Sequence, residues 1–325
     1  MFSDTDYHLL PSSPCIDTGN PDPVYNDHDG TRNDMGIYGG PYASSIYVNP
    51  GESIQAAIDS TDFDMIVNVL AGTYAEDIEM KDGMDLVGES AATTIIEGNI
   101  VCLESDNTIE NFTIIYDEGE YANFTNPNYA DWQILTDAGI TAVDSEITVR
   151  NCIIYPDLAG GTKSPFGKGI QIWNLYGSTA KAPTIDNNLI IHCDMGIYYY
   201  SQAFGGDLAG TIQNSTLDAN KYGIVLRMHN ENPLIQNNII SNSLDGIHIT
   251  YEDGSLLTDR LVNITNNCIF IQDPDGATVW CDETQSEQTP TGIGNIFEDP
   301  LYTAPWDLDY YPDNTNCADM GYREP

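Results

Sequence analysis

Two stretches of the chain decide how it folds: Ile185-Asp-Asn-Asn-Leu-Ile-Ile-His-Cys-Asp-Met-Gly-Ile197 and Ile235-Gln-Asn-Asn-Ile-Ile-Ser-Asn-Ser-Leu-Asp-Gly-Ile247. Each consists of an Ile-x-Asn phrase, an apolar-rich run and a Gly. The chain holds six copies, whose Asn lie 40, 36, 27, 23 and 29 residues apart. From Asn to Gly, however, the last four copies take a nearly constant 9, 9, 9 and 10 residues. A core of constant length with connections of variable length indicates a solenoid of stacked coils.

The repeated Asn has a structural explanation. Asn tolerates the left-handed backbone that a sharp corner between two short strands requires, and its amide can bond to the Asn of the next coil. We therefore predict an Asn ladder with a coil spacing of about 4.8 Å. The segment before each Asn is then one strand, the segment after it a second, and the Gly begins a third. The predicted ladder consists of Asn111, Asn151, Asn187, Asn214, Asn237 and Asn266.

The segment before the repeats resembles a known family. It contains Val48-Asn-Pro-Gly-Glu-Ser-Ile-Gln-Ala-Ala-Ile58, then Val69-Leu-Ala-Gly-Thr-Tyr74 and Thr94-Ile-Ile-Glu-Gly98. This run is similar to the entry segment of secreted right-handed parallel β-helix proteins of the pectate-lyase-like superfold. The resemblance implies an all-β fold, a single-stranded right-handed parallel β-helix, whose N-terminal end is capped by a short helix at Glu52–Asp59. The superfold hosts lyases, hydrolases, esterases and non-enzymes, so it does not specify an activity.

The two ends of the chain share a phrase. Cys15-Ile-Asp-Thr-Gly19 recurs as Cys317-Ala-Asp-Met-Gly321, and the C-terminal copy resembles the closing segment of secreted bacterial and archaeal β-helix proteins. We therefore predict a tail at 1–44 that resembles the end of a preceding unit, a β-helix at 45–302 and a closing segment at 303–325. Two interpretations follow: the chain belongs to a tandem array in a larger surface protein, or its N-terminal tail docks on another copy to build a fibre.

Charge and cysteine content disfavour several classes of binding partner and metal. The chain has 50 acidic and 10 basic residues, a net charge of −40. Nucleic acid is a poor partner, because phosphate binding needs clustered Lys and Arg. We expect no membrane insertion, since no run of 18 apolar residues occurs. We also expect an extracellular or cell-surface location. Seven Cys without a C-x-x-C pair disfavour zinc. Buried free thiols are the default interpretation, and a disulfide such as Cys268–Cys281 stays open.

The alternation of side chains along a strand assigns the outer face of the Gly-initiated sheet. With the Ile after each Gly pointing inward, the first outward column is Thr141, Gln171, Tyr198, Val225, His248 and Thr278. The second is Val143, Trp173, Tyr200, Arg227, Thr250 and Trp280. Neither column contains a carboxylate, whereas glycoside hydrolysis needs two of them. The resemblance likewise implies an Asp pair for the esterases and acidic calcium ligands for the lyases. The missing acids favour a module without catalysis.

Aromatic residues fill these columns instead, and flat rings stack against sugar faces. The alternative is that the insertions flanking these strands fold over the rings and bury them. Our leading prediction is a non-catalytic structural or adhesive module that binds polysaccharide or other copies of itself. The alternative is a polysaccharide lyase or glycoside hydrolase that uses Arg227, His248 and Lys221 as base and neutralising groups. The predicted carbohydrate-binding residues are Trp173, Tyr198, Tyr200, Arg227 and Trp280.

A calcium ion is the one cofactor that the sequence suggests. Asp27, Asp29, Asn33 and Asp34 place oxygen-bearing side chains on a tight turn, as calcium loops do. The bidentate Glu of an EF-hand is missing. The alternative is an Asx-turn loop that only terminates a solenoid.

Overall fold

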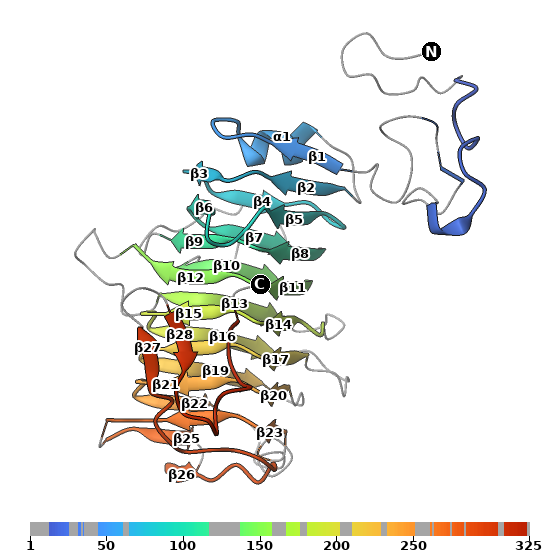
Figure 1. The fold of residues 1–325 in the computed structure, drawn as a ribbon. Helices are drawn as coiled ribbons and strands as arrows, with labels where there is room; N and C mark the ends of the chain where they lie inside the picture. Colours follow the sequence, from blue (N-terminus) through green and yellow to red (C-terminus); the bar gives the residue numbers. More distant parts are fainter. Residues whose placement is uncertain are drawn as a thin grey trace.

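The chain winds into a right-handed parallel β-helix with one short helix at its N-terminal end (Figure 1). The computed structural model describes residues 13–25, 32–33, 35, 45–60, 65–116, 137–157, 167–175, 181–201, 210–228, 233–250, 261, 263–273, 275–282, 284–304 and 309–323. Within these ranges, three stacks of strands form the walls of the solenoid. We name each stack by its place relative to the Asn and Gly of the repeat: the pre-Asn, post-Asn and Gly sheets.

The strands of each sheet follow one another in chain order, one per coil, except that the last strand of the Gly sheet pairs antiparallel with the strand before it. The pre-Asn sheet contains β1 (Ser45–Val48), β2 (Ile66–Val69), β5 (Asp85–Gly88), β8 (Asp106–Glu110), β11 (Glu146–Arg150), β14 (Thr184–Asp186), β17 (Thr211–Gln213), β20 (Leu234–Gln236) and β23 (Ile264–Thr265). The post-Asn sheet contains β3 (Gly72–Tyr74), β6 (Thr94–Glu97), β9 (Thr113–Tyr116), β12 (Ile153–Pro156), β15 (Leu189–Ile191), β18 (Thr216–Asp218), β21 (Ile239–Ser241) and β24 (Cys268–Phe270). The Gly sheet contains β4 (Ile78–Met80), β7 (Ile100–Leu103), β10 (Ala138–Val143), β13 (Lys168–Asn174), β16 (Met195–Ser201), β19 (Tyr222–Met228), β22 (Asp245–Ile249), β25 (Ala277–Cys281) and β26 (Ser286–Gln288).

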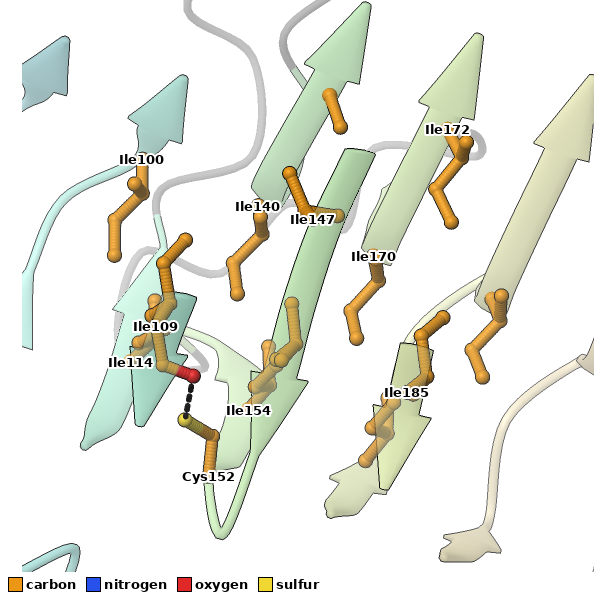
Figure 2. Close-up of a cluster of buried hydrophobic side chains, with 14 of the residues drawn as sticks. Ile100, Ile109, Ile114, Ile140, Ile147, Cys152, Ile154, Ile170, Ile172 and Ile185 are labelled. Atoms are coloured by element: carbon orange, nitrogen blue, oxygen red, sulfur yellow. Dashed lines mark hydrogen bonds between the residues drawn. The ribbon is translucent and has the colours of Figure 1, made fainter. Parts of the chain in front are cut away.

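Equivalent residues of successive coils stack inside the solenoid. In the Gly sheet, Ile140 pairs with Ile170, and Ile170 with Ile197, and all three are fully buried. Figure 2 shows this arrangement, with the Ile side chains of neighbouring coils stacked in the interior and the Cys152 thiol directed at the carbonyl oxygen of Ile109. Because each coil repeats the same apolar shape, the interior is filled without large voids. This packing confirms that the Ile after each Gly points inward.

The six repeated Asn all have a left-handed backbone, with φ between 52° and 65°. Their side chains do not form one continuous stack. Asn187 Nδ2 donates to Asn151 Oδ1 at 2.8 Å, but Asn214 Nδ2 donates to Asp186 Oδ1 at 2.7 Å instead. The expected Asn-to-Asn bonding therefore holds for that pair and is replaced in the next coil.

A continuous ladder of polar side chains lies one residue later in the last four repeats and ends at the half-buried Asn295. Asn238 is fully buried, accepts from Ser215 N at 3.0 Å and donates to Ile212 O at 2.9 Å. The left-handed residue turns its own side chain partly outward, so the following residue points into the corner and bonds the backbone groups there. The ladder consists of Asn188, Ser215, Asn238, Asn267 and Asn295.

Helix α1 (Ile54–Ser60) covers the N-terminal end of the solenoid with Ile54 and Ile58. It begins two residues later than predicted, because Glu52 turns back and accepts from Asn49 N at 2.7 Å. The N–H groups of its first turn have no partner within the helix, and Glu76 accepts from one of them, Ile54 N, at 2.7 Å. In the described part of the chain, no helix has the length and apolar character needed to cross a bilayer.

The closing segment folds back along the outside of the post-Asn sheet (Figure 1). Strands β27 (Tyr302–Ala304) and β28 (Asp309–Pro312) pair antiparallel, and the chain then crosses earlier coils. Gly321 N donates to Asn237 O at 2.8 Å, and Tyr322 N donates to Thr216 Oγ1 at 3.0 Å. The outer face of the post-Asn sheet is therefore covered over several coils by the protein's own closing segment.

Candidate functional site

Four of the five predicted binding residues come together on the outer face of the Gly sheet, whereas Trp280 lies on β25, two strands away from the strand of Arg227. Strands β13, β16 and β19 are parallel neighbours in exact register. Trp173 pairs with Tyr200, and Tyr200 with Arg227, so these three residues form one row across the strands. Tyr198 lies two residues earlier on β16. Residues more than 50 apart in sequence thus meet because the coils have equal strand lengths.

Trp173, Tyr198 and Tyr200 form what we call the aromatic cluster. The ring centroids of Trp173 and Tyr200 are 4.6 Å apart, and those of Trp173 and Tyr198 are 5.8 Å apart, in tilted arrangements that aromatic pairs favour. Tyr200 is buried with 7% exposure, whereas Trp173 and Tyr198 are half-buried. Each of the two interpretations, stacking against sugars and burial, therefore describes part of the cluster. Tyr200 is buried and packs against Trp173, whereas Trp173 and Tyr198 keep exposed surface.

Two cations flank the aromatic cluster. The Lys168 ammonium lies 5.9 Å from the centroid of the Tyr198 ring, and the Arg227 guanidinium carbon lies 5.3 Å from that of Tyr200. Burial raises the pKa of Tyr198, and the nearby Arg227 charge partly offsets this, so the phenol stays neutral at physiological pH. Lys168 is buried, which lowers its pKa against the opposing influence of Asp137 and Asp194. Arg227 is exposed and presents its charge to solvent.

Lys221, a predicted catalytic candidate, belongs to an ion pair. Its ammonium lies 3.4 Å from Asp194 Oδ1 and 5.0 Å from the centroid of the Tyr222 ring. Burial raises the pKa of Asp194, and Lys221 and Lys168 oppose that rise. Lys221 is therefore a partner of a half-buried carboxylate.

His248, the second catalytic candidate, lies on β22 between two carboxylates. Its Nδ1 is 2.7 Å from Asp245 Oδ2, and its Nε2 is 3.3 Å from Asp282 Oδ2. The Tyr222 ring packs against the imidazole, with centroids 5.0 Å apart. Burial by itself lowers the pKa of His248, but the two carboxylates outweigh it and the net pKa is raised. A protonated imidazole that donates from both nitrogens has no lone pair with which to accept a proton.

The predicted positions of Thr278 and Trp280 are wrong by two residues. Trp280 pairs with His248 in the first column, and Thr278 faces Gly246 rather than His248. The cause is Gly276, whose N–H donates to Asp273 O at 3.0 Å in a turn before β25 instead of starting the strand. The sequence marks this repeat as irregular, because it takes 10 residues from Asn to Gly where its neighbours take 9, but that interval does not give the size of the shift.

The shift in register overturns the prediction that the columns lack acids. Asp282 follows β25 at the second-column position, and its N–H donates to Ile249 O at 3.0 Å. Trp280 Nε1 donates to its carboxylate at 3.0 Å. Asp245 and Asp194, which the column assignment did not include, lie one and two residues before a Gly and also face outward to cations. The carboxylates of these three residues are engaged by His248, Lys221 or Trp280.

The predicted calcium loop lies largely outside the described residues. Asp27, Asp29 and Asp34 are not among them, whereas the Asn33 carbonyl accepts from Gly19 N at 2.7 Å. The calcium ion and the fibre contact of the tail therefore stay predictions. Elsewhere in the described ranges, no group of three or more His, Cys, Asp or Glu side chains is placed to hold a metal ion.

Comparisons with known proteins bear on the family and the fold. A sequence model of the family described as NosD, periplasmic copper-binding protein, matches residues 105–293. No curated protein matches the chain. Among solved structures, pectin methylesterase PemA from Erwinia chrysanthemi is 11% identical, with a TM-score of 0.39 over 84% of this chain and 94% of that chain. A pectin methylesterase from carrot is 11% identical, with a TM-score of 0.32 over 78% and 88% of the two chains.

The structure of the PL6 family alginate lyase AlyGC is also similar. It is 12% identical, with a TM-score of 0.30 over 86% of this chain and 57% of that chain. At these identities and TM-scores, the solved structures carry no argument about activity.

Proposed function

The chain belongs to the NosD family of periplasmic proteins, and from this premise we propose that it is an extracytoplasmic module that binds polysaccharide without catalysing a reaction. The binding surface is the aromatic cluster of β13 and β16 together with Arg227 of β19. The closing segment covers the outer face of the post-Asn sheet over several coils, whereas Trp173 and Tyr198 of the Gly sheet keep exposed surface.

One observation carries this proposal: three aromatic rings and an exposed guanidinium are linked by successive ring and cation–π contacts on a protein that is otherwise strongly acidic. The Trp173 and Tyr198 rings supply flat apolar area for the C–H face of a sugar ring. Arg227 supplies a planar donor for sugar hydroxyls or carboxylates. Lys168, Lys221 and Arg227 are three of only ten basic residues in the chain, and all three lie on this face.

The charged groups of the face support binding rather than catalysis. Lyase chemistry needs a basic group with a free lone pair near the sugar. Both nitrogens of His248 lie against carboxylates, those of Asp245 and Asp282, and Lys221 is held by Asp194. These groups stabilise one another and leave the face close to neutral, which lowers the repulsion that a net charge of −40 exerts on an acidic polymer.

Copper, which the family description names, does not fit the described residues. Copper(II) favours imidazole ligands in a tetragonal arrangement with nitrogen or oxygen donors. Both nitrogens of His248 are engaged by Asp245 and Asp282, and within the described ranges no three potential ligands converge. The proposal therefore assigns no role to copper.

Affinity electrophoresis tests the proposal. The protein is run through native gels that each contain one polysaccharide, from neutral glucans and mannans to polyuronates, and retardation by at least one polymer is expected. Parallel incubations with the polyuronates are followed by absorbance for unsaturated sugar ends. Normal migration in every gel would refute polysaccharide binding, and a steady rise in absorbance would replace it with a lyase.

A further inference from the structure

Two cysteine side chains meet where the closing segment covers the last coils. Cys268 begins β24 at the C-terminal end of the post-Asn sheet, and Cys317 lies in a turn of the closing segment after β28. Their Sγ atoms are 2.7 Å apart, and both residues are fully buried. Two other buried thiols, those of Cys152 and Cys193, contact backbone carbonyl oxygens, of Arg150 and Ile191.

The surroundings of the pair are apolar. Ile239, Ile296 and Met320 pack around the two sulfur atoms. The remaining polar contact of Cys268 Sγ is with the carbonyl oxygen of Glu298, at 3.3 Å. Such a pocket supplies no base that would keep either sulfur as a thiolate, and two non-bonded sulfur atoms do not normally pack as closely as these do.

We propose that Cys268 and Cys317 form a disulfide bond that fastens the closing segment to the solenoid. Two S–H bonds break and one S–S bond forms, while the two electrons and two protons pass to an external disulfide, which is reduced to two thiols. An extracytoplasmic location supplies such an oxidant. The inference shares that location with the proposed function but does not depend on polysaccharide binding.

The bond has a structural purpose. The closing segment is otherwise attached to the solenoid by non-covalent contacts, such as the hydrogen bond from Gly321 N to Asn237 O and the packing of Tyr310 and Tyr322 in one apolar cluster with sheet residues. A covalent bond at Cys317 keeps this segment in place over Ile239 and its neighbours, which would otherwise form an exposed apolar strip. It also closes a loop of about 50 residues, which restricts the unfolded chain.

Burial also indicates when the bond forms. It raises the pKa of both thiols, so in the docked state they are protonated and exchange slowly. Oxidation therefore accompanies docking of the closing segment rather than following it. Once formed, the bond is shielded from reductants in the native protein.

Thiol counting tests the proposal directly. The native protein, secreted through an oxidising compartment, is unfolded in denaturant with excess N-ethylmaleimide and its mass is measured. Five of the seven Cys should be alkylated, and peptide mapping should recover a linked pair of peptides containing positions 268 and 317. Seven alkylated thiols, or a linkage between other positions, would overturn it. Protein isolated from the oxidising compartment with both thiols reduced and one copper(I) ion bound to the two sulfurs would also overturn the proposal.

A variant pair separates the bond from general effects of cysteine loss. Cys317→Ala should free Cys268 for alkylation, lower the melting temperature by roughly 5 °C and expose the closing segment to limited proteolysis. Cys281→Ala, also fully buried but on β25, should keep the linked peptides and the protease resistance. Equal protease resistance of the closing segment in Cys317→Ala and wild type would count against a fastening role.

Discussion

The guanidinium carbon of Arg227 lies 5.3 Å from the centroid of the Tyr200 ring, on the neighbouring strand of the Gly sheet. Tyr200 in turn packs against Trp173, so a charge and two rings form one row across three coils. The cation holds the buried ring and remains exposed itself. This row is the surface on which the proposed polysaccharide stacks, and the first two predictions concern it.

Stacking by Tyr198 is tested by removing either its ring or its hydroxyl group. Tyr198→Ala should weaken binding of the best polysaccharide about tenfold, because an aromatic contact contributes roughly 1 kcal/mol beyond its buried area. Tyr198→Phe keeps the ring and should bind within about threefold of the wild type. Titration calorimetry measures both. An equally large loss in the two variants would show that the hydroxyl group, rather than the ring, makes the contact.

Arg227 should distinguish acidic from neutral sugars. We expect Arg227→Ala to lose roughly tenfold in affinity for an oligouronate and less than about threefold for a neutral oligosaccharide of the same length, since the charge-assisted bond is made only by a carboxylate. Raising the ionic strength should reduce the same difference in the wild type. If the variant loses both ligands equally, Arg227 acts by supporting Tyr200 rather than by contacting the ligand.

The raised pKa of His248 predicts a pH-dependent stability. A group whose pKa is higher in the folded state stabilises fully below its unfolded pKa, about 6.5 for His, and loses that contribution as the pH rises through the folded value. Melting temperatures of the wild type and His248→Gln are compared between about pH 5.5 and pH 8.5. The wild type should exceed the variant by a few degrees at the acidic end, with the difference falling at the alkaline end. A difference that grows with pH would contradict this arrangement of charges.

The two Asn positions of one repeat should respond differently to substitution. Asn238→Ala leaves Ser215 N and Ile212 O without partners in the interior, at a cost of roughly 2–3 kcal/mol in free energy of unfolding. Asn237→Gly keeps the left-handed corner at φ 56° and should cost less than about 1 kcal/mol. Denaturant unfolding of both variants measures the difference. If Asn237→Gly lowered the free energy of unfolding more than Asn238→Ala does, Asn237 would have the main structural role.

The architecture was predictable because the repeat constrains every coil in the same way. A fixed Asn-to-Gly interval determines strand length, and the Ile after each Gly determines which side chains face inward. The buried ladder was missed by one residue, since sequence alone does not show which of two adjacent Asn, such as Asn187 and Asn188, turns its side chain into the corner. The neighbouring coils determine which Asn turns inward, because they place backbone N–H and C=O groups in the corner that need a hydrogen-bond partner.

The site was predicted less completely, for reasons of register and of distant contacts. The last coil has three more residues between Asn266 and Thr278 than the coil before it has between Asn237 and Gly246, so Trp280 lies beside His248 and Asp282 reaches the outer face. The contact between Cys268 and Cys317 depends on the path of the closing segment across several coils, which no local pattern encodes. The row of Trp173, Tyr200 and Arg227 was accessible from sequence because each of these residues lies four positions after the Gly of its repeat.

The measurement that tests the central claim most directly is calorimetric titration of the wild type, Trp173→Ala and Tyr47→Ala with the polysaccharide fragment retained most strongly in the gels. Tyr47 is a matched control, because it is an exposed aromatic residue on β1, away from the aromatic cluster. We predict saturable binding by the wild type and Tyr47→Ala with equal dissociation constants, and at least about tenfold weaker binding by Trp173→Ala. Equal affinity of all three proteins, or no binding by any of them, would contradict the assignment of this face as a polysaccharide-binding surface.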